Sequence, residues 1–324
     1  MTYPVISVAM ATYNGQKYIK EQLDSIIAQS YPVSEIIIVD DCSSDSTYSL
    51  LCEYSEVNSK IKITQNEFNL GVVKTFEKAL MSCRGDFIAV SDQDDVWLPN
   101  KIEELVAQIE DNYLLYSDAV VVDDNLNVIN SSNLSFFEQL SSFEQLEDYF
   151  FANNVTGCTM LVSTELIRLV CPFPNFKAMY HDQYLAIMAK YFGKIRKVQQ
   201  ALMLYRQHSS NASASFNRGA YEKFINKYAK LAVDLHELRQ IELFVNNVSV
   251  LSSIDHATNF FLSMAHKRYP RFQLLKYCWN KFDKKMFFWF IRMACLGKWF
   301  AHINYNLVPI KDKLVSFLRK SKSC

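Results

Sequence analysis

The chain lacks several patterns that define common protein classes. Its 324 residues include only seven glycines, and neither the GxGxxG fingerprint of nicotinamide-binding folds nor a Walker A phosphate loop occurs. Dehydrogenase and P-loop kinase functions therefore lose their main support. The sequence also contains no run of about 18 uncharged apolar residues, since Arg292 and Lys298 interrupt the nearest candidate, residues 286–303. We therefore expect no membrane-spanning segment.

Cysteine pairs and a leader sequence are also missing. The eight cysteines are scattered, with no CxxC pair and no zinc-finger spacing. In a chain of this length, such usage is typical of reduced thiols in the cytosol. Residues 1–4 lack the basic start and apolar stretch of a signal peptide. We therefore expect a cytoplasmic protein.

The chain as a whole has no excess of either charge. It holds 34 basic and 34 acidic side chains, which argues against a nucleic-acid binder that works through bulk positive charge. The balance is not uniform, because residues 1–217 hold 15 basic and 27 acidic side chains and residues 218–324 hold 19 and 7. Half of the residues are apolar, which suits a packed core and excludes disorder.

Short apolar runs alternate with helical patterns over the first two hundred residues. This rhythm predicts an α/β domain with a doubly wound, mainly parallel sheet. In such sheets, ligands bind beyond the carboxyl ends of the strands. The predicted strands are residues 4–11, 36–39, 61–65, 87–90, 114–122, 159–162 and 201–205, and the predicted helices are residues 15–29, 47–54, 72–81, 98–109 and 184–191, with a polar helical pattern over 131–149.

The sequence changes character after about residue 217. Glycine and proline become rare, and residues 221–251 follow a 3.6-residue apolar period, so we expect an all-helical region over 218–324. Lys281, Lys285 and Arg292 would share one stripe of a helix rich in Trp and Phe. That pattern favours a helix lying in an anionic membrane interface. The alternative is a basic helical subdomain packed on the acidic first part.

Clustered carboxylates follow two of the predicted strands. Asp92-Gln93-Asp94-Asp95 places three acids in four residues, and these repel one another unless a cation neutralises them. Oxygen ligands with positions left for phosphate suit Mg²⁺ or Mn²⁺. Asp40-Asp41 could accept hydrogen bonds from a nucleobase or ribose. Either cluster could instead be an acidic turn that caps the next helix.

Two later motifs carry further candidate groups. Asp182 follows a proline-marked loop and could act as a general base on a hydroxyl, although an Asp at a helix start is more often an N-cap. Arg206 and His208 lie just past a predicted strand. They could clamp a diphosphate or complete a metal shell, or they could make ordinary polar contacts.

The ordered set of motifs resembles glycosyltransferase family 2, which has a GT-A fold and uses a nucleotide-sugar donor. The wider set resembles bacterial rhamnosyltransferases that build cell-wall and O-antigen polysaccharides, and the resemblance covers roughly residues 1–215. The motifs are ATYNG at 11–15, VDDCSSD at 39–45, NLGVVK at 69–74, SDQDDVWLP at 91–99, NVTGCTM at 154–160, HD at 181–182 and LYRQH at 204–208.

The resemblance implies a donor site and a metal site. Asp41 would face the pyrimidine base, and Asp92 would lie near the ribose and the metal. Asp94 would be the principal ligand of Mg²⁺ or Mn²⁺, with His208 completing the metal shell. The other donor-side residues would be Thr12, Tyr13, Asn14, Lys74 and Arg206.

The resemblance also implies an acceptor side. Asp182 would be the catalytic base that takes a proton from the acceptor hydroxyl. Gln183 stands where relatives commonly carry an aromatic residue, and Cys158 replaces a small residue; both departures lie on the acceptor or sugar side of the expected site. The residues that flank the acceptor would be Trp97, Thr156, Gly157, His181 and Gln183.

These expectations combine into one functional hypothesis with two alternatives. The protein would be a metal-dependent, inverting glycosyltransferase that moves L-rhamnose from dTDP-rhamnose onto a lipid-linked bacterial surface glycan. It would work at the cytoplasmic face of an anionic membrane and bind no nucleic acid. The alternatives are a family 2 transferase that uses a UDP-hexose or UDP-N-acetylhexosamine, and an inactive GT-A scaffold in a synthase complex.

Overall fold

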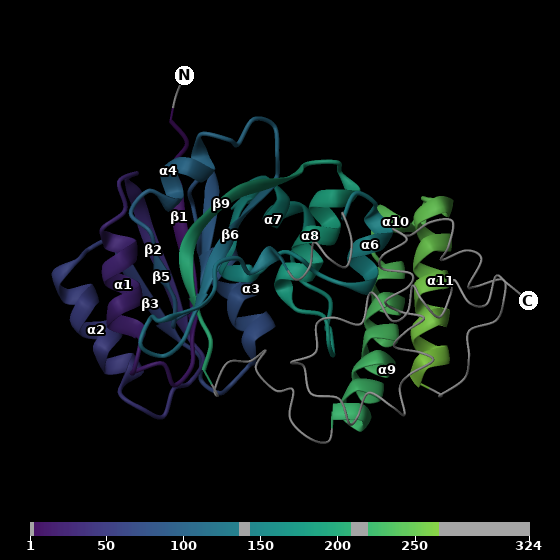
Figure 1. Cartoon of the computed structure of the whole chain (residues 1–324), viewed down its shortest axis with the longest axis horizontal. Helices are drawn as coiled ribbons and strands as arrows, with labels where there is room; N and C mark the ends of the chain where they lie inside the picture. The colour runs from purple at the N-terminus through teal and green to yellow at the C-terminus, as the bar shows by residue number, and fades with distance from the viewer. Residues whose placement is uncertain (1–2, 136–142, 209–219, 266–324) are drawn as a thin grey trace, which may run out of the picture.

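A nine-stranded sheet with helices on both faces forms the centre of the part of the chain described by the computed structural model, residues 3–135, 143–208 and 220–265 (Figure 1). The strand order is β3-β2-β1-β4-β8-β6-β9-β5, and β7 pairs with β6. The strands are β1 (Ile6–Thr12), β2 (Val33–Asp40), β3 (Ile61–Gln65), β4 (Phe87–Ser91), β5 (Val96–Trp97), β6 (Leu114–Val122), β7 (Val128–Asn130), β8 (Met160–Ser163) and β9 (Ile195–Arg206).

The helices include all five predicted ones, with shifted ends. They are α1 (Ile19–Ile27), α2 (Thr47–Val57), α3 (Val72–Ser82), α4 (Lys101–Val106), α6 (Leu146–Phe151), α7 (Thr164–Val170), α8 (His181–Tyr191), α9 (Ala220–Arg239), α10 (Glu242–Val245) and α11 (Val248–Ala265). The short helix α6 lies at the end of the helical pattern predicted over 131–149, and α7 was not predicted.

The first four strands of the sheet are parallel and in register. Thr12 pairs with Asp40, and Asp40 pairs with Gln65, so β1, β2 and β3 end at one edge. Met10 pairs with Ser91, which brings the end of β4 to the same edge. The residues that follow these strands therefore meet in space. This edge is where a ligand of a parallel sheet is expected.

The second half of the sheet is mixed. β8 runs antiparallel between β4 and β6, β9 is parallel to β6, and β5 is antiparallel to β9. β9 covers Ile195–Arg206 rather than the predicted 201–205, and β5 was not predicted because two residues carry no readable periodicity. The pairing of Val96 with Leu204 brings Arg206 beside residues 92–95, which we call the acidic turn. This pairing therefore shapes the candidate site.

Two predicted helices are shorter than expected. The helix predicted over 15–29 begins at Ile19, because Gly15 lies against the acidic turn: a Cβ on Gly15 would fall 2.2 Å from the Gln93 Oε1 atom. The helix predicted over 98–109 covers Lys101–Val106. It starts late because the Leu98 N–H donates to the Leu202 carbonyl, which holds Leu98 against the sheet.

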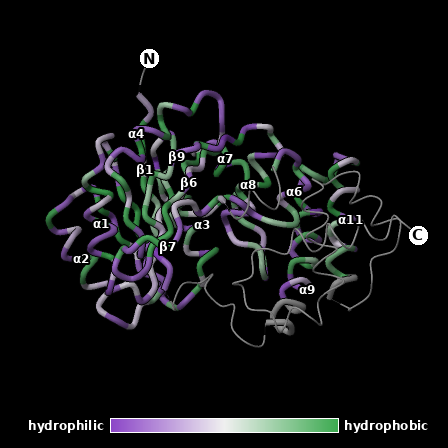
Figure 2. The backbone as a smooth tube through the Cα atoms, in the orientation of Figure 1, coloured by the Kyte–Doolittle hydropathy of each residue, from purple (hydrophilic) through white to green (hydrophobic). Residues whose placement is uncertain are grey.

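Hydrophobic residues predominate along the central strands (Figure 2), and their buried side chains form one core on each face of the sheet. Successive residues of β1 alternate between the faces, with Val8 and Met10 in the core under α1 and Ala9 in the core under α3. The second of these cores continues without a break into the helical region, where it includes Leu235 of α9 and Phe261 of α11. These helices therefore share a core with the sheet.

The described part of residues 218–324 is helical, in agreement with the prediction. No helix in the described ranges is both long and apolar enough to cross a lipid bilayer. The predicted basic stripe of Lys281, Lys285 and Arg292 lies in residues 266–324, outside the described residues. The division of the chain at residue 217 stays a prediction.

The shared core can be tested with Leu235→Ala. Leu235 is fully buried, so its truncation should lower the free energy of unfolding by about 2–5 kcal/mol. The control is Leu262→Ala, whose side chain is 39% exposed and whose loss should cost less than about 1 kcal/mol. Chemical denaturation followed by circular dichroism measures both values. Equally small effects would contradict a core that α9 shares with the sheet.

Candidate active site

The loop after β1 is fastened to the acidic turn by Gln93. The Gln93 Oε1 atom accepts from the Tyr13 N–H at 2.9 Å, and the Gln93 Nε2 atom donates to the Tyr13 carbonyl at 3.0 Å. Asn14 has a positive φ of 50°, and its N–H donates to Ser43 Oγ at 2.9 Å. Tyr13 remains 48% exposed at the sheet edge. Sequence reasoning missed Gln93, because no pattern pairs it with a loop 80 residues away.

Asp40 and Thr12 hold the ends of the first strands together. Thr12 is buried, and its hydroxyl donates to Asp40 Oδ1 at 2.9 Å. Asp40 also accepts from the Ser43 N–H at 2.9 Å and from Gln65 Nε2 at 3.1 Å. The expectation that Thr12 contacts the donor is not supported, because its hydroxyl faces Asp40 inside the fold.

Asp41 holds the loop between β3 and α3. Its Oδ1 atom accepts from Asn66 Nδ2 at 2.9 Å and from the Leu70 N–H at 2.7 Å, and its Oδ2 atom accepts from the Gly71 N–H at 2.9 Å. The carboxylate is 4% exposed. Its observed contacts therefore shape this loop, and the contact with a donor base stays a prediction.

The acidic turn brings carboxylates together in a partly buried place. Burial, and repulsion from Asp95, Asp94 and Asp182, raise the pKa of Asp92 well above its ordinary value. Burial also raises the pKa of Asp94, and the neighbouring His208 opposes that rise. The His208 Nε2 atom lies 2.9 Å from Asp94 Oδ2. The predicted pair of metal ligands therefore lies in contact.

Asp95 is the buried carboxylate of the same turn. It is buried, and its Oδ1 atom accepts from the Arg206 N–H at 3.0 Å. Its Oδ2 atom is buried and has no hydrogen-bond partner among the described residues. One ligand atom each from Asp92, Asp95 and Cys158 lie within 4.8 Å of one another. A partnerless buried oxygen among like charges, beside a carboxylate–imidazole pair, fits a site for Mg²⁺ or Mn²⁺.

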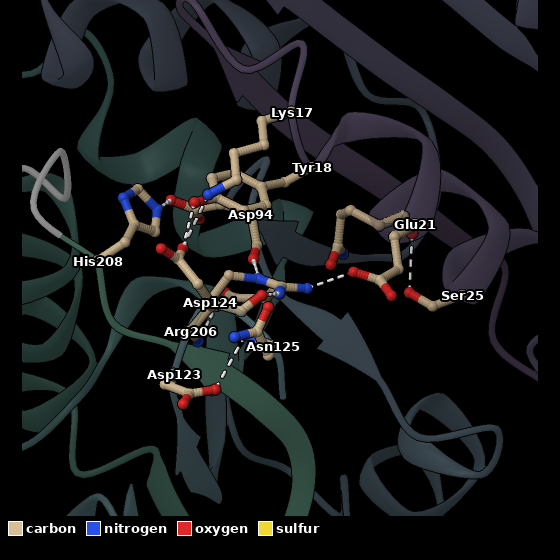
Figure 3. A network of polar contacts seen from close by, with 12 residues as sticks. Lys17, Tyr18, Glu21, Ser25, Asp94, Asp123, Asp124, Asn125, Arg206 and His208 are labelled. Carbon is tan, nitrogen blue, oxygen red and sulfur yellow. Dashed lines mark hydrogen bonds and ion pairs between the residues drawn. The ribbon is translucent and has the colours of Figure 1, made fainter. Parts of the chain in front are cut away.

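Arg206 does not face a diphosphate, contrary to the prediction. Its side chain is 2% exposed, and its Nε and Nη1 atoms donate to the carbonyl oxygens of Asp94 and Asp124 at 2.8 and 2.6 Å. Its Nη2 atom pairs with the Glu21 carboxylate (Figure 3). The strand pairing that creates β5 carries Arg206 into the fold. There it holds the backbone of the acidic turn.

Tyr18 joins Arg206 to His208. The Tyr18 ring stacks on the His208 imidazole with centroids 4.7 Å apart, and the Arg206 guanidinium lies 4.8 Å from the centre of the same ring. The Tyr18 hydroxyl donates to the Asp124 carboxylate, which also pairs with Lys17 at 3.2 Å (Figure 3). The Asp94–His208 pair is therefore braced from three segments of the chain.

Lys74 joins α3 to the loop before α8. Its Nζ atom lies 2.6 Å from Glu77 Oε2 and donates to the Phe173 carbonyl at 2.8 Å. The contact with Glu77 follows from the helical spacing, which places both side chains on one face of α3. These contacts hold the loop before α8, and a contact of Lys74 with the donor stays a prediction.

Trp97 packs inside the fold rather than beside an acceptor, which corrects another prediction. It is 2% exposed, and the Lys101 Nζ atom lies 3.8 Å from the centre of its ring. Lys101 is fully buried beneath the acidic turn, donates to the Cys158 carbonyl, and has a pKa lowered to about 8 by burial. Sequence reasoning missed Lys101, because a lysine at a helix start is usually exposed.

Asp182 lies in the first turn of α8 and is half-buried. Burial raises the pKa of its carboxyl to about 6, and the backbone N–H groups of Gln183 and Gly157 partly offset this rise. The negative charge of Asp182 in turn contributes to the raised pKa of Asp92, so the two carboxylates share one region. A carboxylate with a raised pKa is a suitable general base.

His181 supports Asp182 from inside the core. It is 5% exposed, stacks on Phe76 with centroids 4.1 Å apart, and has a pKa lowered to about 3 by burial. A Cβ on Gly157 would fall 2.9 Å from its Nε2 atom, so Gly157 and His181 pack together. The neutral imidazole therefore does not flank an acceptor as predicted, because it lies beneath Gly157.

The two remaining acceptor-side candidates anchor neighbouring segments. The Gln183 Nε2 atom donates to the Tyr149 carbonyl of α6 at 2.8 Å. The Thr156 Oγ1 atom accepts from Asn133 Nδ2 at 2.8 Å. Both side chains are partly exposed, so a contact with an acceptor stays a prediction for each of them.

Comparison with known proteins matches the model for glycosyl transferase family 2 to residues 7–168. The chain belongs to glycosyl transferase family 2. It is 32% identical to the dTDP-rhamnosyl transferase RfbG of Shigella flexneri over 69% of this chain and 78% of that protein. It is also 32% identical to the Escherichia coli UDP-Glc:alpha-D-GlcNAc-diphosphoundecaprenol beta-1,3-glucosyltransferase WfgD, over 37% of this chain and 48% of that protein.

Solved structures of similar fold agree with this assignment. TarS of S. aureus in complex with UDP-GlcNAc has a TM-score of 0.57 at 19% identity, with 94% of each chain covered. The mannosyltransferase PcManGT of Pyrobaculum calidifontis, in complex with GDP-Man and Mn²⁺, has a TM-score of 0.54 at 17% identity, covering 92% of this chain and 82% of that chain. The protein is a glycosyltransferase with a GT-A fold.

The support that Arg206 gives to the acidic turn can be measured with Arg206→Lys. A lysine cannot reproduce the three contacts of the buried guanidinium, so the free energy of unfolding should fall by about 3–5 kcal/mol. Arg196→Lys is the matched control, because Arg196 pairs with the exposed Glu110 at the surface and its replacement should cost less than about 1 kcal/mol. Urea denaturation compares the two. Equal losses would contradict the bracing role.

The raised pKa of Asp182 predicts a pH-dependent cost in stability. The pKa of Asp182 in the folded protein lies above the ordinary value of 3.8. Its contribution to the free energy of unfolding is therefore fully present below about pH 4 and is lost as the pH rises through about 6. Asp182→Asn removes this titration. Without metal, the variant should therefore gain about 1.4 kcal/mol relative to the wild type between pH 5 and pH 8, since about half of the interval between the two pKa values lies above pH 5. Thermal unfolding in EDTA at both pH values measures the difference, and a constant difference would refute the raised pKa.

Proposed function

We propose that the protein is a metal-dependent, inverting glycosyltransferase that moves L-rhamnose from dTDP-rhamnose onto a growing bacterial surface polysaccharide. The observation that carries the proposal is that Asp182 packs against Gly157, where a Cβ would fall 3.8 Å from the Asp182 Cβ, while the adjacent Cys158 has its thiol within 4.8 Å of ligand atoms of Asp92 and Asp95. A base and a candidate metal site thus share one region, as transfer from a nucleotide sugar requires. The likeness to RfbG supports rhamnose as the sugar.

In this proposal, Asp182 takes the proton of the acceptor hydroxyl as that oxygen attacks the anomeric carbon. The raised pKa makes the carboxylate a better proton acceptor near neutral pH. Asp94 and His208 would hold the divalent cation, which supplies positive charge to the departing diphosphate when bound. Asp92 would complete the ligand set. The Mn²⁺ complex of PcManGT supports the choice of cation.

The donor nucleotide would lie at the carboxyl edge of β1 and β2. Tyr13 offers an exposed aromatic ring at this edge for stacking on the base, with Asn14 and Asp41 beside it. Arg206 and Lys74 are left out of the donor contacts in this proposal, because their charged groups are engaged elsewhere. The donor diphosphate would instead depend on the cation for charge neutralisation.

A UDP-hexose or UDP-N-acetylhexosamine is the second candidate for the donor. It is favoured by the UDP-GlcNAc complex of TarS and by the UDP-Glc specificity in the name of WfgD. The name of WfgD also supports a lipid-linked diphosphate acceptor. In our proposal, the catalytic domain spans residues 1–217, and the basic region over 218–324 meets such an acceptor at the cytoplasmic face of an anionic membrane.

A panel of sugar nucleotides with Mn²⁺ and a lipid-linked acceptor tests the proposal. We expect the fastest turnover with dTDP-rhamnose, loss of turnover in Asp94→Asn, and loss of transfer with retained nucleotide binding in Asp182→Asn. Faster turnover of a UDP-sugar would favour the second candidate. Full activity of both variants would contradict the site. If Mn²⁺ and nucleotides neither bound nor reacted, the inactive scaffold would be the better explanation.

A further inference from the structure

The loop that leads into α8 is hydrogen-bonded to a carboxylate from the helical region. Asp234 of α9 is fully buried. Its two oxygens accept hydrogen bonds from three consecutive backbone N–H groups, those of Lys177, Ala178 and Met179, at 2.6, 2.6 and 2.7 Å. Hydrogen bonds to an ionised acceptor are about twice as strong as neutral ones. Three of them fix the path of the backbone just before Asp182.

The other end of this loop is held from the opposite side. Phe173 donates its N–H to Glu77 Oε1 at 3.1 Å, and its carbonyl accepts from Lys74 Nζ at 2.8 Å. Both of these side chains come from α3, which packs on the sheet. The loop therefore spans two fixed points, one on the sheet side and one on α9. The point on α9 is nearer to the proposed base, since only two residues lie between Met179 and Asp182.

A second residue of α9 affects the electrostatics of Asp182. Lys227 precedes Asp234 by seven residues, so both lie on one face of α9, two turns apart. Lys227 is exposed, and its positive charge partly offsets the rise in the pKa of Asp182 that burial causes. The contacts that carry the proposal remain those of Asp234 with the 177–179 loop.

We propose that Asp234 is a positioning residue for sugar transfer, acting through the backbone of residues 177–179 to fix the first turn of α8 and the Asp182 carboxylate. This rests on the proposed role of Asp182 as the base. The helical region then belongs to the transfer machinery. Misplacement of a reacting group by about 1 Å can cost about 100-fold in rate, so even a small release of this loop is measurable.

Asp234→Asn tests the proposal with little change in volume. The amide has one acceptor oxygen in place of two, so at least one of the three N–H groups loses its partner. We expect kcat to fall at least about 10-fold, with donor KM and the affinity for dTDP and Mn²⁺ unchanged within about twofold. Turnover is measured with the nucleotide sugar that the wild type uses fastest.

Ser253→Ala is the matched control. Its hydroxyl donates to Glu147 Oε1 at 2.8 Å, which links α11 to α6 without involving the 177–179 loop. This variant should keep the wild-type kcat. Equal kcat values for Asp234→Asn and Ser253→Ala, with Asp182→Asn inactive, would overturn the positioning role alone. Transfer by Asp182→Asn would instead overturn the proposed base.

Hydrogen exchange gives a readout that needs no turnover. In the wild type, the amides of Lys177, Ala178 and Met179 should exchange as slowly as those inside β1, because all three are bonded to a buried carboxylate. In Asp234→Asn they should exchange at least about 10-fold faster, and in Ser253→Ala at the wild-type rate. Fast exchange in the wild type, or no change in Asp234→Asn, would overturn the proposal.

Discussion

The repulsion among four carboxylates is the constraint on which the site depends. Asp92, Asp94 and Asp95 follow one strand, and Asp182 joins them from a helix about 90 residues later. Burial raises the pKa of each, so the ionised cluster is costly without a cation. A protein that only needed to be stable would avoid this arrangement. A divalent cation that binds there relieves the repulsion, and this relief favours binding of the cation together with an anionic nucleotide.

The surrounding residues hold these charges in place without neutralising them all. The Arg206 guanidinium binds the backbone carbonyl of Asp94, the Arg206 N–H donates to the Asp95 carboxylate, and Gln93 links the acidic turn to the loop after β1. Lys101 lies buried beneath the turn, where its charge opposes the raised pKa of Asp95. Asp234 binds the backbone of the loop before Asp182, as Arg206 binds the backbone of the acidic turn. The supporting contacts are therefore mostly to backbone, which leaves side chains of the site available for ligands.

The sequence was sufficient for most of the strands and helices and for the family, because strand ends and motif order are local signals, but it did not predict β5 or α7. Asp94 could be proposed as a metal ligand from the resemblance, and His208 from its place just past a predicted strand. The role of Arg206 could not, because it depends on the pairing of a two-residue strand with β9. Trp97 was misplaced for the same reason. Asp234 gave no signal, because its partners lie more than 50 residues away and are backbone groups.

In the proposed mechanism, the acidic turn is held ready for a divalent cation. Calorimetric titration of Mn²⁺ into the protein with dTDP present measures this binding. We expect saturable binding of one cation that is lost in Asp94→Asn and retained in the surface variant Arg196→Lys. Absence of binding in the wild type, or equal binding in Asp94→Asn, would contradict the mechanism.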